Sequence, residues 1–399
     1  MRILVFNAGS SSLKCHLFDW TGVAGHDTPK SSIWQAHVDW SKRSAPASMT
    51  VESTSAAKIE EEIAKPEIPS ILRRLVETLP ATPELACHRV VHGGSLFGHA
   101  TELTREAQSK AMTFNHFAPS HNPIQLEIVG ETESLFGPKV RQFGVFDTAF
   151  HATLKPTEYV LAGPAHWRER GIRRYGFHGI SHQNVSRRTA QLLGRDLKDL
   201  RLITAHLGNG CSLTAIGGGI SMATTMGFTP LDGLVMGTRS GSIDPGVLIH
   251  LVRQHSYSAE MLDAELNKES GMKGISGVSG DMREVLEAAA GGNKDAQLAF
   301  DIFTGSVARH AAGLITALGG LDALVFTAGI GENSPEVRDA VARKLNFLGI
   351  ELDPEINQSK PIDQVISKAG AGPLVLAVRS EEDWEIARQC FAAAGSVLC

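Results

Sequence analysis

The sequence lacks the features that would place it in a membrane, on a secretory route or on a nucleic acid. It contains no stretch of 18 consecutive apolar residues, so we expect no membrane-spanning helix. The apolar run at the N-terminus stops at Asn7, which does not match a signal peptide. The net charge is −5 and no long basic run occurs, so we expect no nucleic-acid partner.

Cysteine is also scarce. The five cysteines are widely spaced, odd in number and form no Cys-x-x-Cys pair, which argues against a disulfide framework or a zinc ribbon. This usage indicates a reducing compartment, and we expect a cytoplasmic location. His88 and His92 form an H-x-x-x-H pair, but Arg89 stands where the zincin pattern requires Glu, so we expect no zinc site.

The size and composition are those of a globular protein. A chain of 399 residues exceeds one ordinary core, so two domains are expected. The hydrophobic share of 42% and the charged share of 20% are typical of folded domains. The 40 glycines cluster in short loops after apolar runs, which indicates a backbone that approaches ligands closely.

The first such loop is FNAGSSSLK, residues 6–14, between two apolar runs. One interpretation is a hairpin turn, because small polar residues tolerate turn conformations. The other is a phosphate cradle made of backbone N–H groups, the hydroxyls of Ser10 and Ser12, and Lys14. It is not a Walker A loop, since an apolar, strand-like run follows where that motif opens a helix. Both interpretations stay open on this stretch alone.

A similar pattern returns nearly 200 residues later. LITAHLGNGCSLTAI, residues 202–216, again has an apolar run, a turn of Gly, Asn and small polar residues, and a second apolar run. This weak similarity predicts two domains that open with the same hairpin, and two such hairpins could hold both ends of a polyphosphate. Chance likeness between hairpins is the alternative.

Helical segments are also predicted. Residues 58–79 have a helical pattern broken by prolines, and residues 180–194 predict a helix with Ser181 as its N-cap. GIGEN, residues 329–333, lies between a strand and a helix that Ser334 would cap, where N–H groups favour anions or ribose hydroxyls. It lacks the last Gly of a dinucleotide fingerprint.

Several loops carry reactive side chains with no packing explanation. Arg89, His121, Asp147, His178 and Arg239 all lie in short polar or Gly-rich segments. An Arg between glycines has little apolar surface for its stem, so anion binding is favoured over a structural role. Asp147 ends a strand, where either acid–base catalysis or capping would explain a carboxylate.

Eight segments together resemble the acetate kinase family. They are, in order, NAGSSSLK, HRVVHGG, FDTAFH, RRYGFHGISH, HLGNGCSL, TTMGFTPLDGLVMGTRSGSIDPG, SGDMRE and FTAGIGENSP. The likeness runs from residue 1 to about residue 390 except for residues 20–80. It implies an α/β, duplicated actin-like ATPase (ribonuclease H-like) fold with two domains around a nucleotide cleft. Their expected limits are 1–150 plus 383–399, and 151–382.

The resemblance implies reversible, magnesium-dependent transfer of the γ-phosphoryl group of ATP to acetate, giving acetyl phosphate and ADP, by a homodimer. Mn²⁺ could replace Mg²⁺, and Asn7 and Glu381 would belong to the metal site. The implied catalytic residues are Asp147, His178, Arg239, Arg89 and His121, and Arg89 would also bind the acetate carboxylate. The implied nucleotide-binding residues are Lys14, Ser10, Ser12, His206, Leu207, Gly208, Asn209, Gly210, Asp281, Met282, Arg283, Gly329, Ile330, Gly331, Glu332 and Asn333.

These roles agree with the chemistry. Phosphoryl transfer depends on positioning and on neutralising charge, and here two anions must meet. A carboxylate nucleophile with a reference pKa of about 4 is already ionised and needs no general base. We therefore expect Asp147 to orient Arg89 or a metal-bound water. A nucleotide-dependent switch protein on the same fold is the rival of another class, but it would not use Arg89, His178 and Arg239 together.

The sequence departs from the family at two informative places. Val91, Phe177 and Pro230 match the lining of the acyl pocket, but Ser120 stands where the family has Leu. A hydroxyl there enlarges the pocket and makes it more polar, so we expect tolerance of propionate or a short polar acid, and a propionate kinase stays the alternative. An unusual Arg-Ser pair precedes the Glu-Glu pair at residues 381–382, which leaves open which Glu meets the magnesium ion.

Overall fold

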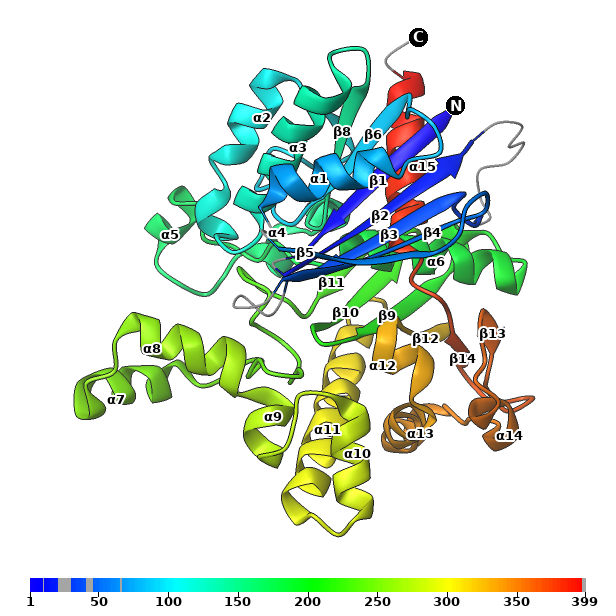
Figure 1. Ribbon diagram of the computed structural model, residues 1–399. Coiled ribbons are helices and arrows are strands. Elements are labelled where there is room, and N and C mark those ends of the chain that lie inside the picture. The colour runs from blue at the N-terminus through cyan, green and yellow to red at the C-terminus, as the bar shows by residue number, and fades with distance from the viewer. Residues whose placement is uncertain (10, 21–29, 41–45, 65–66, 397–399) are drawn as a thin grey trace. The chain divides into compact units, whose positions relative to one another are not determined.

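The structure is a computed structural model that describes residues 1–9, 11–20, 30–40, 46–64 and 67–396 (Figure 1). Ser10, a predicted phosphate ligand, lies outside the described residues. The chain divides into two compact units, residues 1–150 with the segment from Glu381 onward, and residues 151–380. The limits expected from the sequence differ by two residues at the second boundary, since Glu381 and Glu382 group with the first unit.

The first unit contains a sheet with the strand order β5-β4-β3-β2-β1-β6-β8-β7. β1 pairs antiparallel with β2 and parallel with β6, and β6 pairs parallel with β8. The strands are β1 (Arg2–Ala8), β2 (Ser12–Asp19), β3 (Trp34–Asp39), β4 (Ala47–Ser53), β5 (Ile59–Ile63), β6 (Leu85–Val90), β7 (Thr101–Glu102) and β8 (Arg141–Phe146).

Helices lie against this sheet. They are α1 (Ile68–Glu77), α2 (Arg105–Met112), α3 (Asn122–Phe136) and α15 (Glu382–Ser396), with the short turns η1 (Asn115–Phe117) and η2 (Ala149–Thr153). The helix expected over residues 58–79 is wrong in its first part, because β5 occupies residues 59–63. Its Ile and Glu residues alternate in exposure while the strand pairs with β4, so sheet pairing prevailed over the helical pattern.

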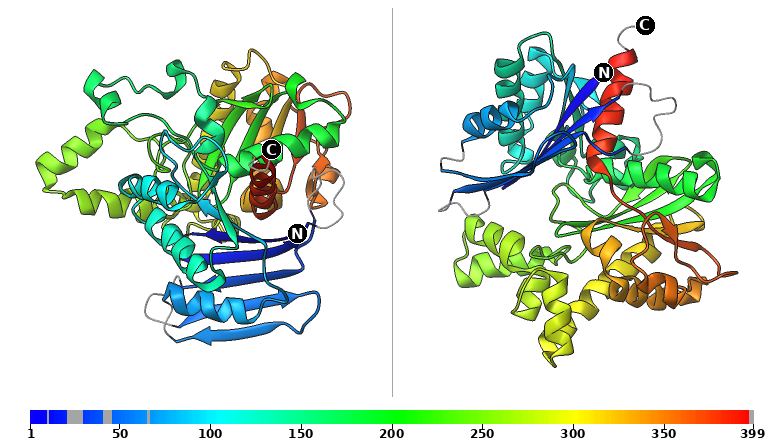
Figure 2. Two further views of the ribbon diagram at one scale, coloured as in Figure 1. Left: turned by 90° about the horizontal axis from the view of Figure 1, so that it is seen from above. Right: turned by 45° about the vertical axis from the view of Figure 1, so that its right-hand side comes forward.

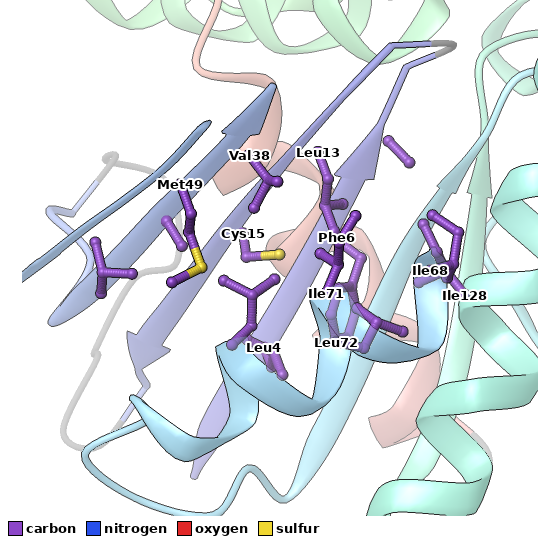
Figure 3. Close-up of a cluster of buried hydrophobic side chains, with 14 of the residues drawn as sticks. Leu4, Phe6, Leu13, Cys15, Val38, Met49, Ile68, Ile71, Leu72 and Ile128 are labelled. Atoms are coloured by element: carbon purple, nitrogen blue, oxygen red, sulfur yellow. The ribbon is translucent and has the colours of Figure 1, made fainter. Parts of the chain in front are cut away.

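One face of the sheet forms the main core of the first unit (Figure 3). Leu13 and Cys15 of β2 pack with α1 on this face, so the alternation of a strand turns Lys14 and His16 to the other face. Asn7 pairs with Lys14 in the β1–β2 register and shares that second face. α15 contacts β1, β6 and β8, so it brings its acidic first turn to Asn7 and His16.

The second unit repeats this plan. Its sheet has the strand order β11-β10-β9-β12-β14-β13, with an antiparallel β9–β10–β11 meander and parallel pairs β9–β12 and β12–β14. The order β11-β10-β9-β12-β14 therefore matches β3-β2-β1-β6-β8, which confirms the predicted repeat of the opening hairpin. The strands are β9 (Arg201–Leu207), β10 (Cys211–Gly217), β11 (Ile220–Thr224), β12 (Ala323–Thr327), β13 (Gln364–Val365) and β14 (Leu374–Ala377).

The helices α6, α11 and α12 of the second unit contact this sheet, and α7 and α8 form an arm that projects away from it (Figures 1 and 2). The helices of this unit are α4 (Pro156–Tyr159), α5 (Ala165–Glu169), α6 (Gly179–Leu193), α7 (Pro245–His255), α8 (Ala259–Ala264), α9 (Gly271–Ser276), α10 (Met282–Ala290), α11 (Lys294–Ile315), α12 (Ala328–Asn333), α13 (Pro335–Lys344) and α14 (Pro354–Gln358), with the turns η3 (Leu197–Asp199), η4 (Glu265–Glu269) and η5 (Asn346–Leu348). Among the described helices, none is long and apolar enough to cross a membrane.

Two helix starts bear on the site. Ser181 is not the N-cap of α6, because the helix begins at Gly179 with His178 in the capping position at φ 56°. The Ser181 hydroxyl instead lies 2.8 Å from Nδ1 of His206. The predicted cap of α13 is confirmed, since the Ser334 side chain accepts a hydrogen bond from the Val337 N–H.

Candidate active site

Charged side chains of the first unit meet where its parallel strands end. Arg89 lies on β6, Asp147 directly follows β8, and the backbone N–H of Asp147 donates to the Val90 carbonyl oxygen at 3.0 Å. Asn7 lies near the end of the neighbouring β1. The carboxyl ends of parallel strands share one edge of a sheet, which explains why residues far apart in the sequence converge there.

Arg89 and Asp147 form a two-pronged ion pair. Arg89 Nε donates to Oδ1 of Asp147 at 3.0 Å, and Nη2 donates to Oδ2 at 2.6 Å. The Asp147 side chain is only 3% exposed and that of Arg89 18% exposed. Burial alone would lower the pKa of Arg89, but the charge and hydrogen bonds of Asp147 raise it, so the guanidinium stays charged. Two parallel bonds also hold its plane in one orientation.

Asn7 joins this pair to the start of α15. Its Oδ1 accepts a hydrogen bond from Arg89 Nη1 at 3.3 Å, and its Nδ2 donates to Oδ1 of Asp383 at 2.7 Å. The other carboxylate oxygen of Asp383 lies 3.2 Å from Nε2 of His16. Sequence reasoning missed Asp383 and His16. The one feature that could have indicated Asp383 is that it is a third acidic residue directly after the Glu-Glu pair.

The two glutamates before Asp383 differ in their surroundings. Glu381 has a φ of 39°, a left-handed conformation that is strained for a side chain with a Cβ. Burial raises the pKa of Glu382 to about 7, opposed by the Arg89 charge and reinforced by the charges of Asp147 and Asp383.

The donor set of this cluster suits a hard cation. Asn7 offers an amide oxygen and Glu381 and Glu382 offer carboxylates, which are the ligand types that Mg²⁺ and Mn²⁺ prefer. Among the described residues, no group of three or more His, Cys, Asp or Glu side chains could hold a metal by itself. Mg²⁺ commonly takes one or two protein ligands and completes its shell with water and phosphate oxygens. The residues present thus fit a metal that arrives with a nucleotide.

The candidate acyl-binding residues of the first unit lie around the loop after β6. Val91 is 4% exposed, and its N–H donates to Oε1 of Gln125 at 2.8 Å. Gln125 Nε2 in turn donates to the Ala8 carbonyl oxygen at 2.7 Å, so α3 ties this loop to β1. Ser120 is exposed, and His121 immediately precedes α3. Gln125 is a site-supporting residue that sequence reasoning missed.

In the second unit the turn after β9 is surrounded by cationic and aromatic side chains. The Gly208 N–H donates to the Gly210 carbonyl oxygen at 3.1 Å, which closes the turn. A Cβ on Gly210 would lie 3.2 Å from Arg239 Nη1 and 3.5 Å from His178 Nε2, so glycine allows both groups to approach the backbone. The His178 ring stacks on the His206 ring with centroids 4.1 Å apart. Predicted residues from three separate motifs therefore converge on one turn.

Buried hydroxyls and imidazoles orient His178. Its Nδ1 lies 2.9 Å from the Ser212 hydroxyl, which is also 2.7 Å from Nε2 of His182. Burial, together with the nearby imidazoles of His151 and His206, lowers the pKa of His182 well below its ordinary value, so it is neutral. Sequence reasoning gave neither His182 nor Ser212 a role in the site.

Arg239 lies in a less polar setting than Arg89. Its Nη1 donates to the Pro230 carbonyl oxygen at 3.3 Å and contacts the Met236 sulfur at 3.9 Å. Burial lowers its pKa, although the Cys211 thiol partly opposes this. A guanidinium held by neutral groups can attract an incoming anion. Phe177 of the predicted acyl pocket is buried, with its carbonyl oxygen 3.0 Å from Nε2 of His151.

A cavity of about 670 Å³ opens beside the same turn. That volume is within the range of small-molecule sites. Its lining is Gly208, Asn209, Gly280, Asp281, Met282, Arg283, Leu286, Gly329, Ile330, Asn333, Ser334 and Glu336. Most of the predicted nucleoside contacts are therefore brought together, and Gly280, Leu286, Ser334 and Glu336 are additions.

The predicted nucleotide contacts of this unit that do not line the cavity are His206, Leu207, Gly210, Gly331 and Glu332. GIGEN forms the helix α12 instead of a loop before a helix, and its Gly329, Ile330 and Asn333 line the cavity. Gly331 is buried, and Glu332 Oε1 accepts hydrogen bonds from the N–H groups of Ala328 at 2.9 Å and Ser380 at 3.0 Å. Leu207 is fully buried in β9. Gly331, Glu332 and Leu207 therefore lie beside the cavity and are not part of its lining.

Two α/β units with the same strand order, and a nucleoside-sized cavity beside a glycine turn, define an actin-like ATPase fold. Residues 2–388 match the model of the acetokinase family. The chain is 45% identical to an acetate kinase of Gloeobacter violaceus, over 98% of this chain and 99% of that one. The chain belongs to the acetokinase family.

Solved structures agree with this assignment. An acetate kinase of Porphyromonas gingivalis superposes with a TM-score of 0.89 at 35% identity, covering 98% of this chain and 99% of that one. A propionate kinase of Francisella tularensis also has a TM-score of 0.89, at 34% identity, with coverages of 97% and 98%. Both acyl substrates thus occur among proteins of this fold and degree of similarity.

Proposed function

We propose that the protein is an acetate kinase, which transfers the γ-phosphoryl group of ATP reversibly to acetate and forms acetyl phosphate and ADP. The chain belongs to the acetokinase family, and one observation carries the proposal. The two candidate anion-binding arginines, Arg89 and Arg239, have different surroundings that suit two different tasks. Arg89 is charged and fixed by Asp147, as a carboxylate-binding group requires. Arg239 and His178 approach Gly210 beside the nucleoside-sized cavity, as groups that neutralise a transferred phosphoryl require.

In this mechanism Arg89 binds the acetate carboxylate and aligns it for in-line attack. The carboxylate is already ionised, so no group has to remove a proton from it. Arg239 and His178 stabilise the charge on the equatorial oxygens of the phosphoryl group, and the turn at Gly208–Gly210 supplies backbone N–H groups. Lys14 and Ser12 bind phosphate oxygens, and His121 completes the polar surroundings of the acceptor.

Asp147 acts in this scheme as a positioning residue. Both of its oxygens accept hydrogen bonds from Arg89, so the carboxylate holds the guanidinium in one orientation. Asn7, with Glu381 or Glu382, would hold Mg²⁺ or Mn²⁺, which supplies charge neutralisation on the nucleotide phosphates when bound.

A propionate kinase is the second candidate, and Ser120 is the observation that favours it. The side chain is exposed, so a longer acyl chain would meet a small polar group there instead of a leucine. A coupled assay of ADP formation with Mg·ATP against acetate, propionate, butyrate and glycolate decides between the two. The highest kcat/KM with acetate supports the proposal, a maximum with another acid reassigns the substrate, and no turnover with any acid refutes it.

We also propose that two copies of the chain associate through α7 and α8. No side chain of α7 is buried, although Val247, Ile249 and Val252 are apolar and between 41% and 52% exposed, and Met261 of α8 is 46% exposed. Exposed apolar surface of this extent marks a contact site. In a two-fold symmetric dimer, this surface of one chain would pack against the same surface of the second chain.

The association can be measured by light scattering after size exclusion. We expect Ile249→Glu to give a monomer, whereas Leu298→Glu on α11, which is also half exposed, should leave the mass unchanged. A dimeric Ile249→Glu variant would exclude this surface.

A cytoplasmic location is proposed as well. The four cysteines that the structure describes are buried free thiols, as expected in a reducing compartment. Fractionation of the source cells with an antibody against the chain tests this, and recovery outside the cytoplasmic fraction would contradict it.

A further inference from the structure

We propose that Asp383, braced by His16, is a positioning residue that sets the orientation of the Asn7 amide and thereby presents the amide oxygen to the Arg89 side of the site. The proposal rests on the proposed function, because it assigns a role to Asn7 within that reaction. It concerns a carboxylate at the start of α15 and a histidine on β2 that no sequence motif had singled out.

The contacts of Asn7 show which end of its side-chain amide faces Asp383. An ionised carboxylate can only accept hydrogen bonds, so the group that Asn7 turns toward Asp383 must be its NH₂. That bond is 2.7 Å long. The amide oxygen then faces Arg89 Nη1 at 3.3 Å. A rotation of the amide by 180° would place NH₂ against a guanidinium and lose both bonds, so Asp383 selects one orientation of Asn7.

His16 holds Asp383 in place. Its Nε2 lies 3.2 Å from Oδ2 of Asp383, while its Nδ1 lies 3.2 Å from the Ser32 hydroxyl. The His16 ring also stacks on Phe18. Both carboxylate oxygens of Asp383 are therefore engaged by side chains of β1 and β2, and the side chain is 21% exposed.

The simpler explanation is that Asp383 only complements the dipole of α15. An acidic residue in the first turn does stabilise a helix, but Glu382 and Glu385 already occupy that turn. A dipole role also needs no side-chain partner, whereas Asp383 has two on separate strands. The two explanations differ in their effect on metal dependence, since the amide oxygen of Asn7 is the atom that can serve a hard cation.

Asp383→Leu removes the acceptor and keeps the branched shape at Cγ. We expect Asp383→Leu to raise the Mg²⁺ concentration for half-maximal activity by roughly tenfold or more, in line with outer-shell substitutions at metal sites. Asp383→Asn keeps an oxygen that can accept from Asn7 and should stay within about threefold of the unmodified protein by the same comparison. His16→Leu should give a smaller rise, because it removes only the brace.

A second measurement does not depend on turnover. Titration calorimetry gives the Kd of ADP with and without Mg²⁺ for each variant, and the gain in affinity due to Mg²⁺ should shrink in Asp383→Leu and recover in Asp383→Asn. Glu52→Gln is the matched control, because Glu52 lines the same cavity of about 440 Å³ as Asp383 and Lys14. It removes one negative charge without touching Asn7 and should change neither quantity.

The outcomes distinguish failure of the proposed function from failure of the positioning role of Asp383. If the unmodified protein turns over no acid, the proposed function fails while the calorimetry still tests Asp383. If Asp383→Leu and His16→Leu both keep the Mg²⁺ dependence and the Mg²⁺-linked affinity within twofold, the positioning role is refuted. A lowered Tm with unchanged Mg²⁺ dependence would assign Asp383 to helix stability alone, which equally overturns the proposal.

Discussion

The role of Asp147 can be decided by a double-mutant cycle with Arg89. The two side chains share two short hydrogen bonds of 3.0 Å and 2.6 Å in a site where Asp147 is 3% exposed. Breaking a buried ion pair costs about 3–5 kcal/mol. That figure is a cost to folding, whereas in kcat/KM a group displaced by about 1 Å can cost roughly two decades, and we expect an effect of that size.

The single and double variants then have distinct expected values. Arg89→Ala should lower kcat/KM by about 10²–10³, as the loss of one charge-stabilising group does. Asp147→Asn should lower it by roughly 10² through misplacement of the guanidinium. If Asp147 acts through Arg89, the double variant should resemble Arg89→Ala alone, since the positioned group is already absent.

The assay is initial-rate ADP formation with Mg·ATP and acetate. Additive effects, which would total roughly 10⁴–10⁵, would mean that Asp147 acts independently of Arg89 and would refute the positioning argument. The pH–rate profile gives a second criterion. Loss of an acidic limb in Asp147→Asn with unchanged Mg²⁺ dependence would identify Asp147 as an acid–base group instead.

Three further predictions concern the acyl site, the nucleoside cavity and acid stability. Ser120→Leu should lower the ratio of propionate to acetate kcat/KM by about tenfold, the effect of a small change in an apolar pocket, and an unchanged ratio would contradict the assignment of Ser120. Leu286→Asp should raise the KM for ATP by roughly tenfold with little change in kcat, because it removes uniform binding in the cavity, and a fall in kcat alone would argue against a binding role. His88 is buried, which lowers its pKa to about 4, opposed by the bond to Gln142. Between pH 6.5 and 4 the unfolded chain therefore binds a proton at His88 that the folded chain does not bind. Acidification from pH 7.5 to 5 should lower the free energy of unfolding by about 2 kcal/mol through this residue. In urea unfolding, the free energy of unfolding of His88→Gln should fall less over the same pH range.

The sequence-based prediction worked where local chemistry carries the information. The glycine turn at residues 208–210 was predictable, because such residue types between apolar runs have few structural explanations, whereas anion binding by Arg239 stays a prediction. The repeated hairpin also predicted the duplication, since the same alternation of apolar runs and a turn forms the same pair of strands. The predicted cap at Ser334 needed only the local pattern of a hydroxyl before proline.

Prediction failed where distant segments decide the outcome. The strand β5 looked helical, and only its pairing with β4 makes it extended. GIGEN was expected to be a loop, but it forms the helix α12, whose Glu332 accepts hydrogen bonds from the N–H groups of Ala328 and Ser380. The clamp from Gln125 to Ala8 joins residues 117 positions apart, and no local pattern announces such a bond.

The amino-acid sequence by itself determined which residue types are present for anion binding and that two similar α/β units carry them. Only the tertiary structure decided how these residues act on one another. It paired Asp147 with Arg89, and it placed Asp383 within hydrogen-bond distance of Asn7. The physical reason is that a motif specifies chemical groups, whereas the direction of a side chain depends on strand register and on the phase of α15, which long-range packing sets.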